Sequence, residues 1–326
     1  MSGPRVSVII PTHNRPEKLE ETLAHLTRQS LDASDYEIIV VDDGSTPPVT
    51  LPANFRLIRL GGGERSAARN KGAAAARGEL LVFVDDDITV GNNFLAAHLE
   101  AHREWPRALL VGAIRLPESA LLTPFGRFRQ RLEDSDIPKR RGPTGMRNFC
   151  AAANTAISHT RFDELGGFDA GIASAEDQDL ALRHTASGEL IVFVPEARDI
   201  HRDSSLDLRS YCRRAEWGAE MMIPFCRRYP DLPDNVVRER INGPVRWGAE
   251  PIGLSVRKTA KTAFAAAPLR LVLMGTAIIL ERLAPGSALL ERIYRLMLGI
   301  HLQRGYRRGQ ETEAVGQGRL PVRLAG

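Results

Sequence analysis

The stretch that decides the fold is Leu80-Leu81-Val82-Phe83-Val84, followed directly by Asp85-Asp86-Asp87. A short apolar run of this length is typical of a strand that is buried on both faces of a parallel sheet. The three carboxylates come at its carboxyl end, where open α/β sheets bind their ligands. Because burying unpaired carboxylates is costly, the cluster indicates a cation or a hydrogen-bonded role. The Asp-x-Asp spacing suggests a hard divalent cation that bridges to phosphate, and the alternative is a solvated acidic turn.

Strand and helix patterns alternate around this stretch. Strands are predicted at residues 5–10, where Pro11 is expected to stop the strand, and at 36–41, 55–60 and 190–195, with helices at 17–29 and 66–77. This alternation indicates βαβ units and a mainly parallel sheet. Right-handed crossovers bring the strand ends to one edge. We therefore expect three polar segments to meet there: Pro11-Thr12-His13-Asn14, Asp42-Asp43-Gly44-Ser45 and Asp85-Asp86-Asp87.

The middle of the chain is less regular. Residues 115–148 show little apolar periodicity and are expected to form a long loop, either a functional lid or a disordered segment. A small-residue strand is predicted over 149–157. Glu176-Asp177 then opens a helix in which Leu180 and Leu182 supply apolar contacts, and His201 follows one strand and one turn later.

Four motifs, in this order and at this spacing, resemble the successive motifs of the family-2 inverting glycosyltransferases of GT-A fold. They are Val8-Ile9-Ile10-Pro11-Thr12-His13-Asn14-Arg15, Val40-Val41-Asp42-Asp43-Gly44-Ser45, Ala68-Arg69-Asn70-Lys71-Gly72 and Phe83-Val84-Asp85-Asp86-Asp87. The resemblance covers residues 5–225. It implies an α/β fold with a mostly parallel central sheet flanked by helices. The catalytic domain would span 1–225, with a nucleotide-sugar half over 1–114 and an acceptor half over 115–225, followed by a basic, helical C-terminal extension over 226–326.

The resemblance assigns one set of residues to the nucleotide: Pro11, Thr12, Asn14, Asp43, Arg65, Arg69, Asp85 and Asp86. Asp43 would accept a hydrogen bond from the N3–H of a uracil-like base, and Arg65 or Arg69 would face the phosphates. Structural alternatives stand beside these roles. Pro11 and Asn14 can end a strand and cap a helix, Asp43-Gly44 is an ordinary turn dipeptide, and Arg69 can form an ion pair on a helix face.

The same resemblance implies a metal site. Asp87, supported by Asp85, would hold Mn²⁺ or Mg²⁺, and His201 stands where many GT-A enzymes carry a third ligand to the metal or the diphosphate. A lone histidine is more often structural, so this alternative stays open. Arg213 and Arg214 would pair with the diphosphate, or they form a basic helix face.

Inverting transfer needs one base that takes a proton from the acceptor hydroxyl. The segment Gly166-Gly167-Phe168-Asp169, followed by Glu176-Asp177, is similar to the acceptor segment of the family and maps the base onto Asp177. Glu176 is the rival, and it would more naturally position the acceptor together with Asn154 and Gly167. The alternative is a capped helix start, because carboxylates in a first turn interact favourably with the helix dipole.

Composition sets further bounds. The 326 residues are 43% hydrophobic, which supports one large α/β domain and an appendage. Three cysteines leave one unpaired under any disulfide scheme, and no secretory signal precedes Val6, so we expect a cytoplasmic setting. From Ile252 onward the chain carries twelve Lys and Arg but four Asp and Glu, a net charge of +8, against +4 for the whole chain. The basic charge therefore belongs to the tail, which disfavours nucleic-acid binding by the catalytic domain.

Three explanations of the tail compete. Its apolar stripes at 271–280 and 289–300 could pack on the catalytic domain, or form a basic platform peripheral to the inner face of an anionic cell membrane, or form a spanning hairpin interrupted by Pro268 and Pro285. The first apolar run is too short to span a bilayer by itself.

The function implied by the resemblance is metal-dependent, inverting transfer of one sugar from a nucleotide-diphospho-sugar, with UDP as the first choice of nucleotide. The acceptor would be a hydroxyl, lipid-linked ones included, in cell-envelope glycan or glycolipid synthesis. The Gln-x-x-Arg-Trp motif of processive enzymes is absent, which disfavours a polymerising synthase. A sugar-1-phosphate nucleotidyltransferase is the alternative, although the Gly-rich loop of that class is missing. A non-catalytic nucleotide-sugar-binding scaffold is disfavoured by the carboxylates themselves.

Overall fold

The chain forms two compact units in the computed structural model, which describes residues 3–135, 137–202 and 207–316. Unit 1 contains residues 1–117 and 132–203, and unit 2 contains residues 118–131 and 204–326. This division assigns residues 204–225 to unit 2, whereas the sequence-based division placed them in the catalytic domain. The donor and acceptor halves stay a prediction. Arg319 and Arg323 of the basic tail lie outside the described residues.

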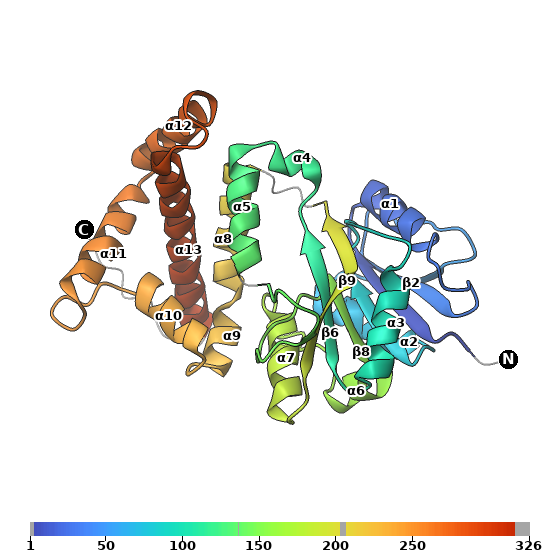
Figure 1. Cartoon of the computed structure of the whole chain (residues 1–326). Helices are drawn as coiled ribbons and strands as arrows, with labels where there is room; N and C mark the ends of the chain where they lie inside the picture. The colour runs from blue at the N-terminus through green and yellow to red at the C-terminus, as the bar shows by residue number, and fades with distance from the viewer. Residues whose placement is uncertain (1–2, 136, 203–206, 317–326) are drawn as a thin grey trace. The chain divides into compact units, whose positions relative to one another are not determined.

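Unit 1 is built around one mixed sheet with the strand order β3-β2-β1-β4-β8-β6-β9-β5, and β7 pairs with β9 (Figure 1). The strands are β1 (Val6–Thr12), β2 (Tyr36–Asp43), β3 (Arg56–Leu60), β4 (Leu80–Val84), β5 (Ile88–Val90), β6 (Leu109–Arg115), β7 (Gly142–Pro143), β8 (Asn154–Ser158) and β9 (Ile191–His201). β3, β2, β1 and β4 run parallel, as do β6 and β9, whereas β8 is antiparallel to both of its neighbours. The expected mostly parallel α/β sheet is confirmed.

Helices cover both faces of this sheet, because the buried strands are apolar on both sides. The helices of unit 1 are α1 (Pro16–Leu26), α2 (Arg65–Ala75), α3 (Phe94–Glu104), α6 (His159–Glu164) and α7 (Glu176–Ala186). Val82 packs in one core cluster with Leu23 of α1 and Leu95 of α3. Phe83, the next residue, packs in the other cluster with Leu180 of α7. The alternation along β4 therefore distributes its side chains to two helical layers.

The prediction that residues 115–148 form a long loop is wrong. This segment contains α4 (Glu118–Leu121), α5 (Pro124–Ser135) and β7. Phe125 and Phe128 are buried on α5, and both rings lie against Tyr294, with centroids 5.2 and 5.1 Å away. The apolar face of α5 is short and is completed by a residue far away in sequence, so local periodicity did not reveal it.

Three smaller expectations also need correction. β1 continues through Pro11 to Thr12. Its pairing with β4 ends at Ile9, so from there on the strand has a neighbour on one side only, and the missing N–H of Pro11 is tolerated. The strand expected over 149–157 begins at Asn154. His201 ends β9 itself rather than following a turn.

Unit 2 is helical, as expected for the C-terminal extension. In addition to α4 and the first part of α5 it contains α8 (Leu208–Met221), α9 (Ile223–Arg228), α10 (Pro233–Asn242), α11 (Ile252–Phe264), α12 (Ala267–Leu283) and α13 (Ala288–Gly316). The long helix α13 packs closely on α8, since a side chain at Gly305 would collide with the backbone carbonyl of Glu216. Glu216 in turn accepts hydrogen bonds from His301 and Arg304 of α13.

Candidate active site

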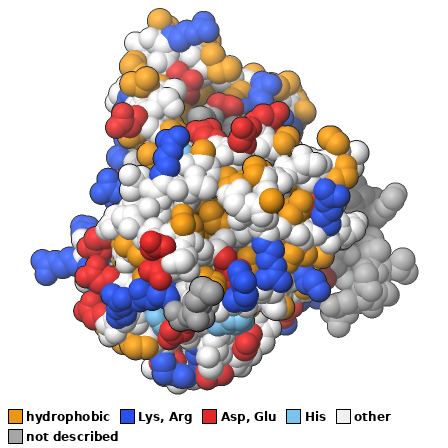
Figure 2. Space-filling view, turned by 90° about the vertical axis from the view of Figure 1, so that its right-hand side faces the viewer, with side chains coloured by type: hydrophobic (Ala, Val, Ile, Leu, Met, Phe, Trp, Pro, Cys, Tyr) orange, Lys and Arg blue, Asp and Glu red, His pale blue; other side chains and the backbone are white. Residues whose placement is uncertain are grey.

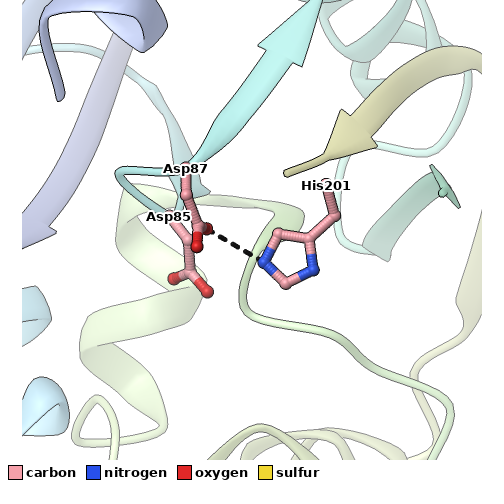
Figure 3. Close-up of side chains that lie close together, drawn as sticks. All are labelled: Asp85, Asp87 and His201. Atoms are coloured by element: carbon pink, nitrogen blue, oxygen red, sulfur yellow. Dashed lines mark ion pairs between the residues drawn. The ribbon is translucent and has the colours of Figure 1, made fainter. Parts of the chain in front are cut away.

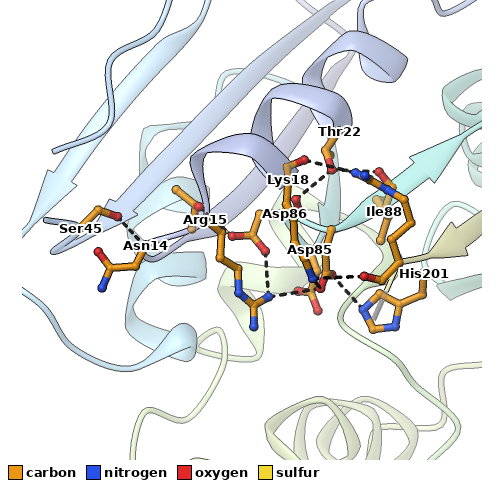
Figure 4. Close-up of polar contacts among 12 residues, drawn as sticks. Asn14, Arg15, Lys18, Thr22, Ser45, Asp85, Asp86, Ile88 and His201 are labelled. Carbon is orange, nitrogen blue, oxygen red and sulfur yellow. Dashed lines mark hydrogen bonds and ion pairs between the residues drawn. The ribbon is translucent and has the colours of Figure 1, made fainter. Parts of the chain in front are cut away.

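The carboxyl ends of β1, β2 and β4 meet at one edge of the sheet of unit 1, as expected. The hydroxyl of Thr12, the last residue of β1, donates to Oδ2 of Asp86 after β4, at 2.7 Å. The backbone N–H of Asn14 donates to Oγ of Ser45 beyond β2, at 2.9 Å (Figure 4). Asn14 adopts a positive φ of 54°, which asparagine tolerates better than most residues. These contacts tie together the three motifs that sequence reasoning had placed at this edge.

Asp43 ends β2 with a carboxylate suited to receive a donor. It is 8% exposed, and its Oδ1 accepts no hydrogen bond from the described residues. Glycines surround it. A side chain at Gly44 would collide with the backbone of Gly62, and one at Gly63 would lie 3.5 Å from that Oδ1. Glycine at position 63 therefore places no side chain against this buried oxygen, and glycine at position 44 lets the backbone of Gly62 pack close to the end of β2.

Asp85, Asp87 and His201 bring one ligand atom each to within 4.8 Å of one another (Figure 3). The register of the sheet explains this proximity: antiparallel pairing of β5 with β9 aligns Ile88 with His201, and Asp87 immediately precedes Ile88. Oδ1 of Asp87 is buried, and Nε2 of His201 lies 2.9 Å from it as an ion pair. Two carboxylates and an imidazole with their ligand atoms this close together fit a divalent cation.

Two cations that sequence reasoning left without a role also face Asp87. Nη1 of Arg15 and Nζ of Lys18 each lie 3.2 Å from its Oδ2. Nη1 of Arg15 also donates to Oδ1 of Asp86, at 3.2 Å (Figure 4). Burial opposes the charge of Asp87, but His201, Lys18 and Arg15 hold its pKa well below the usual range. Burial likewise opposes the charge of His201, and the neighbouring Asp87 carboxylate raises the pKa of that imidazole. The sequence could have indicated this role for Lys18, because it lies on the first turn of α1, shortly after the Asn14-Arg15 motif.

Arg69 connects the candidate metal ligands Asp85, Asp87 and His201, here called the metal-type group, to helix α7, which carries the expected base. It is 1% exposed, and it donates through Nη2 to Asp85 at 2.7 Å and through Nη1 to Glu176 at 2.8 Å. Burial opposes ionisation of Asp85, yet Arg69 lowers its pKa, and Arg65 contributes. Of the two arginines assigned to the phosphates, Arg65 is exposed at the start of α2, while Arg69 is committed to two carboxylates.

Asp177 lies in the first turn of α7, preceded by Ala175 in the left-handed conformation (φ 70°). Its carboxylate accepts from the backbone N–H of Gln178 at 2.8 Å and of Ala152 at 3.3 Å. Burial and the neighbouring Glu176 raise the pKa of Asp177 to about 7, against the opposing effect of these N–H groups and Arg69. Such a carboxyl exchanges its proton near neutral pH, as a general base must.

Asn154 and Gly167 were both expected to contact the acceptor. In the structure, both make contacts within the protein. Asn154 is 0% exposed; its Oδ1 lies 2.9 Å from Nε2 of His98 and its amide donates to the carbonyl of Ala197. Gly167 is buried with φ +74°, and a side chain there would meet Asn70, which bonds Phe168. The sequence could not show that Asn154 is bonded within the sheet and that Gly167 packs against Asn70 of α2.

Arg213 and Arg214 lie on α8 of unit 2, so their expected contact with a diphosphate stays a prediction. One residue that sequence reasoning missed is Asp199, on β9 two positions before His201. It is 0% exposed, neither of its carboxylate oxygens accepts a hydrogen bond from the described residues, and burial raises its pKa to about 8. The signal was the alternation Arg198-Asp199-Ile200-His201, which places Asp199 and His201 on one side of the strand.

Comparison with known proteins agrees with this geometry. Residues 7–147 match the family described as glycosyl transferase family 2. The pre-mycofactocin glycosyltransferase of Mycobacterium tuberculosis (strain ATCC 25618 / H37Rv) is 27% identical over 245 residues, covering 71% of this chain and 50% of that protein. The chain thus spans about half the length of this curated relative. The uncharacterized glycosyltransferase YfnE of Bacillus subtilis (strain 168) is 33% identical over 296 residues, covering 74% of each protein.

Among solved structures, the mannosyltransferase PcManGT from Pyrobaculum calidifontis, in complex with GDP-Man and Mn²⁺, superposes with a TM-score of 0.57 at 18% identity. The match covers 94% of this chain and 88% of that chain. At this identity the likeness concerns the fold, and it confirms the expected GT-A fold. Together with the 33% identity to YfnE over three quarters of both chains and the match of residues 7–147, it shows that the chain belongs to glycosyl transferase family 2.

Proposed function

We propose that the protein is an inverting, divalent-metal-dependent glycosyltransferase that moves one sugar from a nucleotide-diphospho-sugar to a hydroxyl acceptor. One observation carries the proposal: Arg69 connects Asp85 of the metal-type group to Glu176, the neighbour of Asp177. Two carboxylates that would bind the cation and a carboxyl with a pKa of about 7 are thereby linked. Family membership supports the same reaction class.

The residues that would hold the metal are Asp85, Asp87 and His201. An imidazole nitrogen beside two carboxylates suits Mn²⁺ better than Mg²⁺, which prefers oxygen ligands and retains water. PcManGT, which has the same fold, binds Mn²⁺ together with GDP-Man. When bound, the cation supplies positive charge opposite the leaving diphosphate. Arg15 and Lys18, both 3.2 Å from Asp87, would add positive charge at the same place.

The nucleotide would lie against the ends of β1 and β2. Oδ1 of Asp43, which accepts no hydrogen bond from the described residues, would accept the imino N–H of the base. Thr12 and Asn14 would shape the same pocket, with Arg65 at the phosphates. A single acceptor oxygen suits the N3–H of a pyrimidine such as uracil better than the paired N1–H and N2 amino donors of guanine. UDP-sugars are therefore our first choice over GDP-sugars, and the donor panel below separates them from dTDP-sugars, whose thymine has the same N3–H.

Asp177 would act as the base. The acceptor O–H gives its proton to this carboxylate while its oxygen bonds to the anomeric carbon from one face. The bond from that carbon to the diphosphate oxygen breaks on the other face, and the nucleoside diphosphate leaves with the electron pair. Glu176 is less suited to accept the proton, because Arg69 holds its Oε1 at 2.8 Å. It would instead keep the start of α7 in place.

The test is release of nucleoside diphosphate from a panel of UDP-, GDP- and dTDP-sugars, with Mn²⁺, with Mg²⁺ and with a chelator. We expect one nucleotide to give turnover and a raised Tm with Mn²⁺, and the chelator to abolish turnover. NMR of the product should show an inverted anomeric centre. Formation of nucleotide-sugar from sugar-1-phosphate would favour the nucleotidyltransferase, and binding without any turnover would favour the scaffold.

A further inference from the structure

Helix α12 of unit 2 exposes an aliphatic face. The side chains of this face, here called the α12 apolar face, are Leu269, Leu271, Val272, Ile278, Ile279 and Leu283. They lie on one side of the helix at helical spacing, and exposed fractions reach 65% for Leu271 and 79% for Leu283. Single exposed apolar residues are ordinary, but a contiguous group of this kind marks an interaction surface.

Two charged side chains of α12, Arg270 and Glu281, point toward the rest of unit 2. Glu281 accepts a hydrogen bond from the hydroxyl of Tyr294 on α13 at 2.6 Å, and Arg270 donates to the carbonyl of Ala265 at 3.0 Å. A helix that faces water has the opposite arrangement, with charges outside and apolar residues inside. The surroundings of the outer face of α12 are therefore expected to be apolar.

Helix α11 continues this arrangement. Its Ile252 and Val256 are exposed, whereas Lys258 and Lys261 are 2% and 4% exposed. Nζ of Lys258 lies 2.6 Å from Glu250, and burial lowers the pKa of Lys261 to about 8. Arg257 on α11 and Arg282 on α12 remain at the surface and flank the exposed aliphatic residues.

Length limits how such a surface can meet a bilayer. α12 has 17 residues, about 26 Å, which is less than the hydrocarbon core of roughly 30 Å. Within the described residues no single helix is long and apolar enough to cross a membrane. α11 and α12 together pass by length and composition, but a bend of 91° separates them. Lying in the plane of the interface suits this geometry better than spanning.

We propose that the α12 apolar face, with Ile252 and Val256 of α11, inserts into the interfacial region of an anionic lipid bilayer. Charge favours lipid over a second protein surface, because the chain from Ile252 onward carries a net charge of +8. Protein interfaces are also enriched in aromatic residues and carry regular hydrogen bonds, whereas this face is aliphatic. Surface arginines such as Arg257 and Arg282 can reach the headgroups while their stems stay on apolar surface. The site for sugar transfer would thereby be held near lipid-linked hydroxyls.

The experiment is vesicle sedimentation with the full chain. Vesicles of phosphatidylcholine with about one-third phosphatidylglycerol are compared with pure phosphatidylcholine, at about 50 mM and about 500 mM NaCl. We expect binding to the anionic vesicles at low salt, with release of most of the protein at high salt. Arg257→Gln/Arg282→Gln should weaken partitioning about 30-fold, from roughly fivefold per arginine.

The decisive variant is Leu271→Gln/Val272→Gln/Ile279→Gln/Leu283→Gln, which keeps helix-forming residues at exposed positions and should lower partitioning at least tenfold. Val236→Gln/Val237→Gln on α10 is the matched control, since both valines are about half exposed in the same unit, and it should bind like the native chain. Circular dichroism verifies folding, and Ile279→Gln/Leu283→Gln replaces the fourfold variant if that one unfolds.

Three outcomes would overturn the proposal. The first is failure of the native chain to bind anionic vesicles at low salt, and the second is equal binding by the α12 variant. The third is a dimer in sedimentation velocity that the α12 substitutions dissociate while vesicle binding is unchanged, because a second copy would then cover this face. Sugar transfer is not part of the readout, so each of these results leaves the proposed reaction to its own test.

Discussion

Asp87 and Asp177 are the same residue type in two regions of unit 1, and their surroundings move their pKa values in opposite directions. Asp87, at the end of β4, faces His201, Lys18 and Arg15, which together overcome the cost of burial and keep it ionised. Asp177, at the start of α7, is half-buried beside Glu176, and its pKa rises to about 7. Neighbouring charges decide which carboxylate can hold a cation and which can take a proton.

Arg69 stands between the two regions and contributes to both. Its two donors bind Asp85 and Glu176, so it keeps one metal-type carboxylate charged and compensates one of the two acids at the start of α7. Without it, two carboxylates would face each other across a buried site. The predictions that follow remove one side of this comparison at a time.

The largest effect should come from the base. Asp177→Asn should lower kcat roughly 10²–10⁴-fold, the range for loss of a general base, while donor affinity measured by calorimetry stays near the native value. The kcat of Glu176→Gln should fall by a smaller factor, because the carboxylate of Asp177 remains. An inactive Glu176→Gln beside an active Asp177→Asn would reverse the assignment.

Removing the bridge should cost stability. Arg69→Met leaves Asp85 and Glu176 without their shared partner, and breaking such a buried arrangement costs up to about 3–5 kcal/mol of unfolding free energy. Urea unfolding measures this difference. Arg77→Met is the control, since Arg77 pairs with Glu37 but is 66% exposed, and its loss should cost under about 1 kcal/mol. Equal costs for the two variants would mean that Arg69 does not hold the two regions together.

On the metal side, Asp87→Asn should lower kcat roughly 10²–10³-fold, because the charge that stabilises the departing diphosphate is lost. Isothermal titration should show weaker Mn²⁺ binding in the same variant. Asp163→Asn, an exposed carboxylate on α6, is the control and should leave both quantities unchanged. Near-native kcat for Asp87→Asn in saturating donor would exclude Asp87 as a ligand.

The smallest effect is a pH dependence that belongs to Asp177. Its pKa of about 7 predicts that kcat/KM rises about tenfold per pH unit below pH 7 and levels above it, since the base must be deprotonated. The free energy of unfolding should instead fall as pH rises. The folded pKa lies above the unfolded one, so the contribution of this carboxyl is present at low pH and lost as pH rises through about 7. Asp177→Asn should therefore be more stable than the native chain at pH 8, with a difference that shrinks below pH 7.

Local sequence was sufficient where neighbours along the chain determine structure. The apolar runs before Asp43 and Asp85 form strands, and parallel topology brings their ends together, so the site edge could be predicted. Asp85, Asp87 and His201 lie together in the structure, and their expected role as metal ligands stays a prediction. The helix α5 was not predictable, because its aromatic residues pack on Tyr294, which lies more than 160 residues further along the chain.

The sequence by itself determined the α/β alternation, the acidic strand ends and the helical tail, because each depends on periodicity and on residue types adjacent in the chain. Only the tertiary structure decided that Arg69 is committed to two carboxylates, that Asn154 is enclosed in the sheet, and that Glu281 of α12 faces inward. Those outcomes depend on strand register and on which helix faces meet. A one-residue shift between β5 and β9 would have turned His201 to the opposite face, away from Asp87.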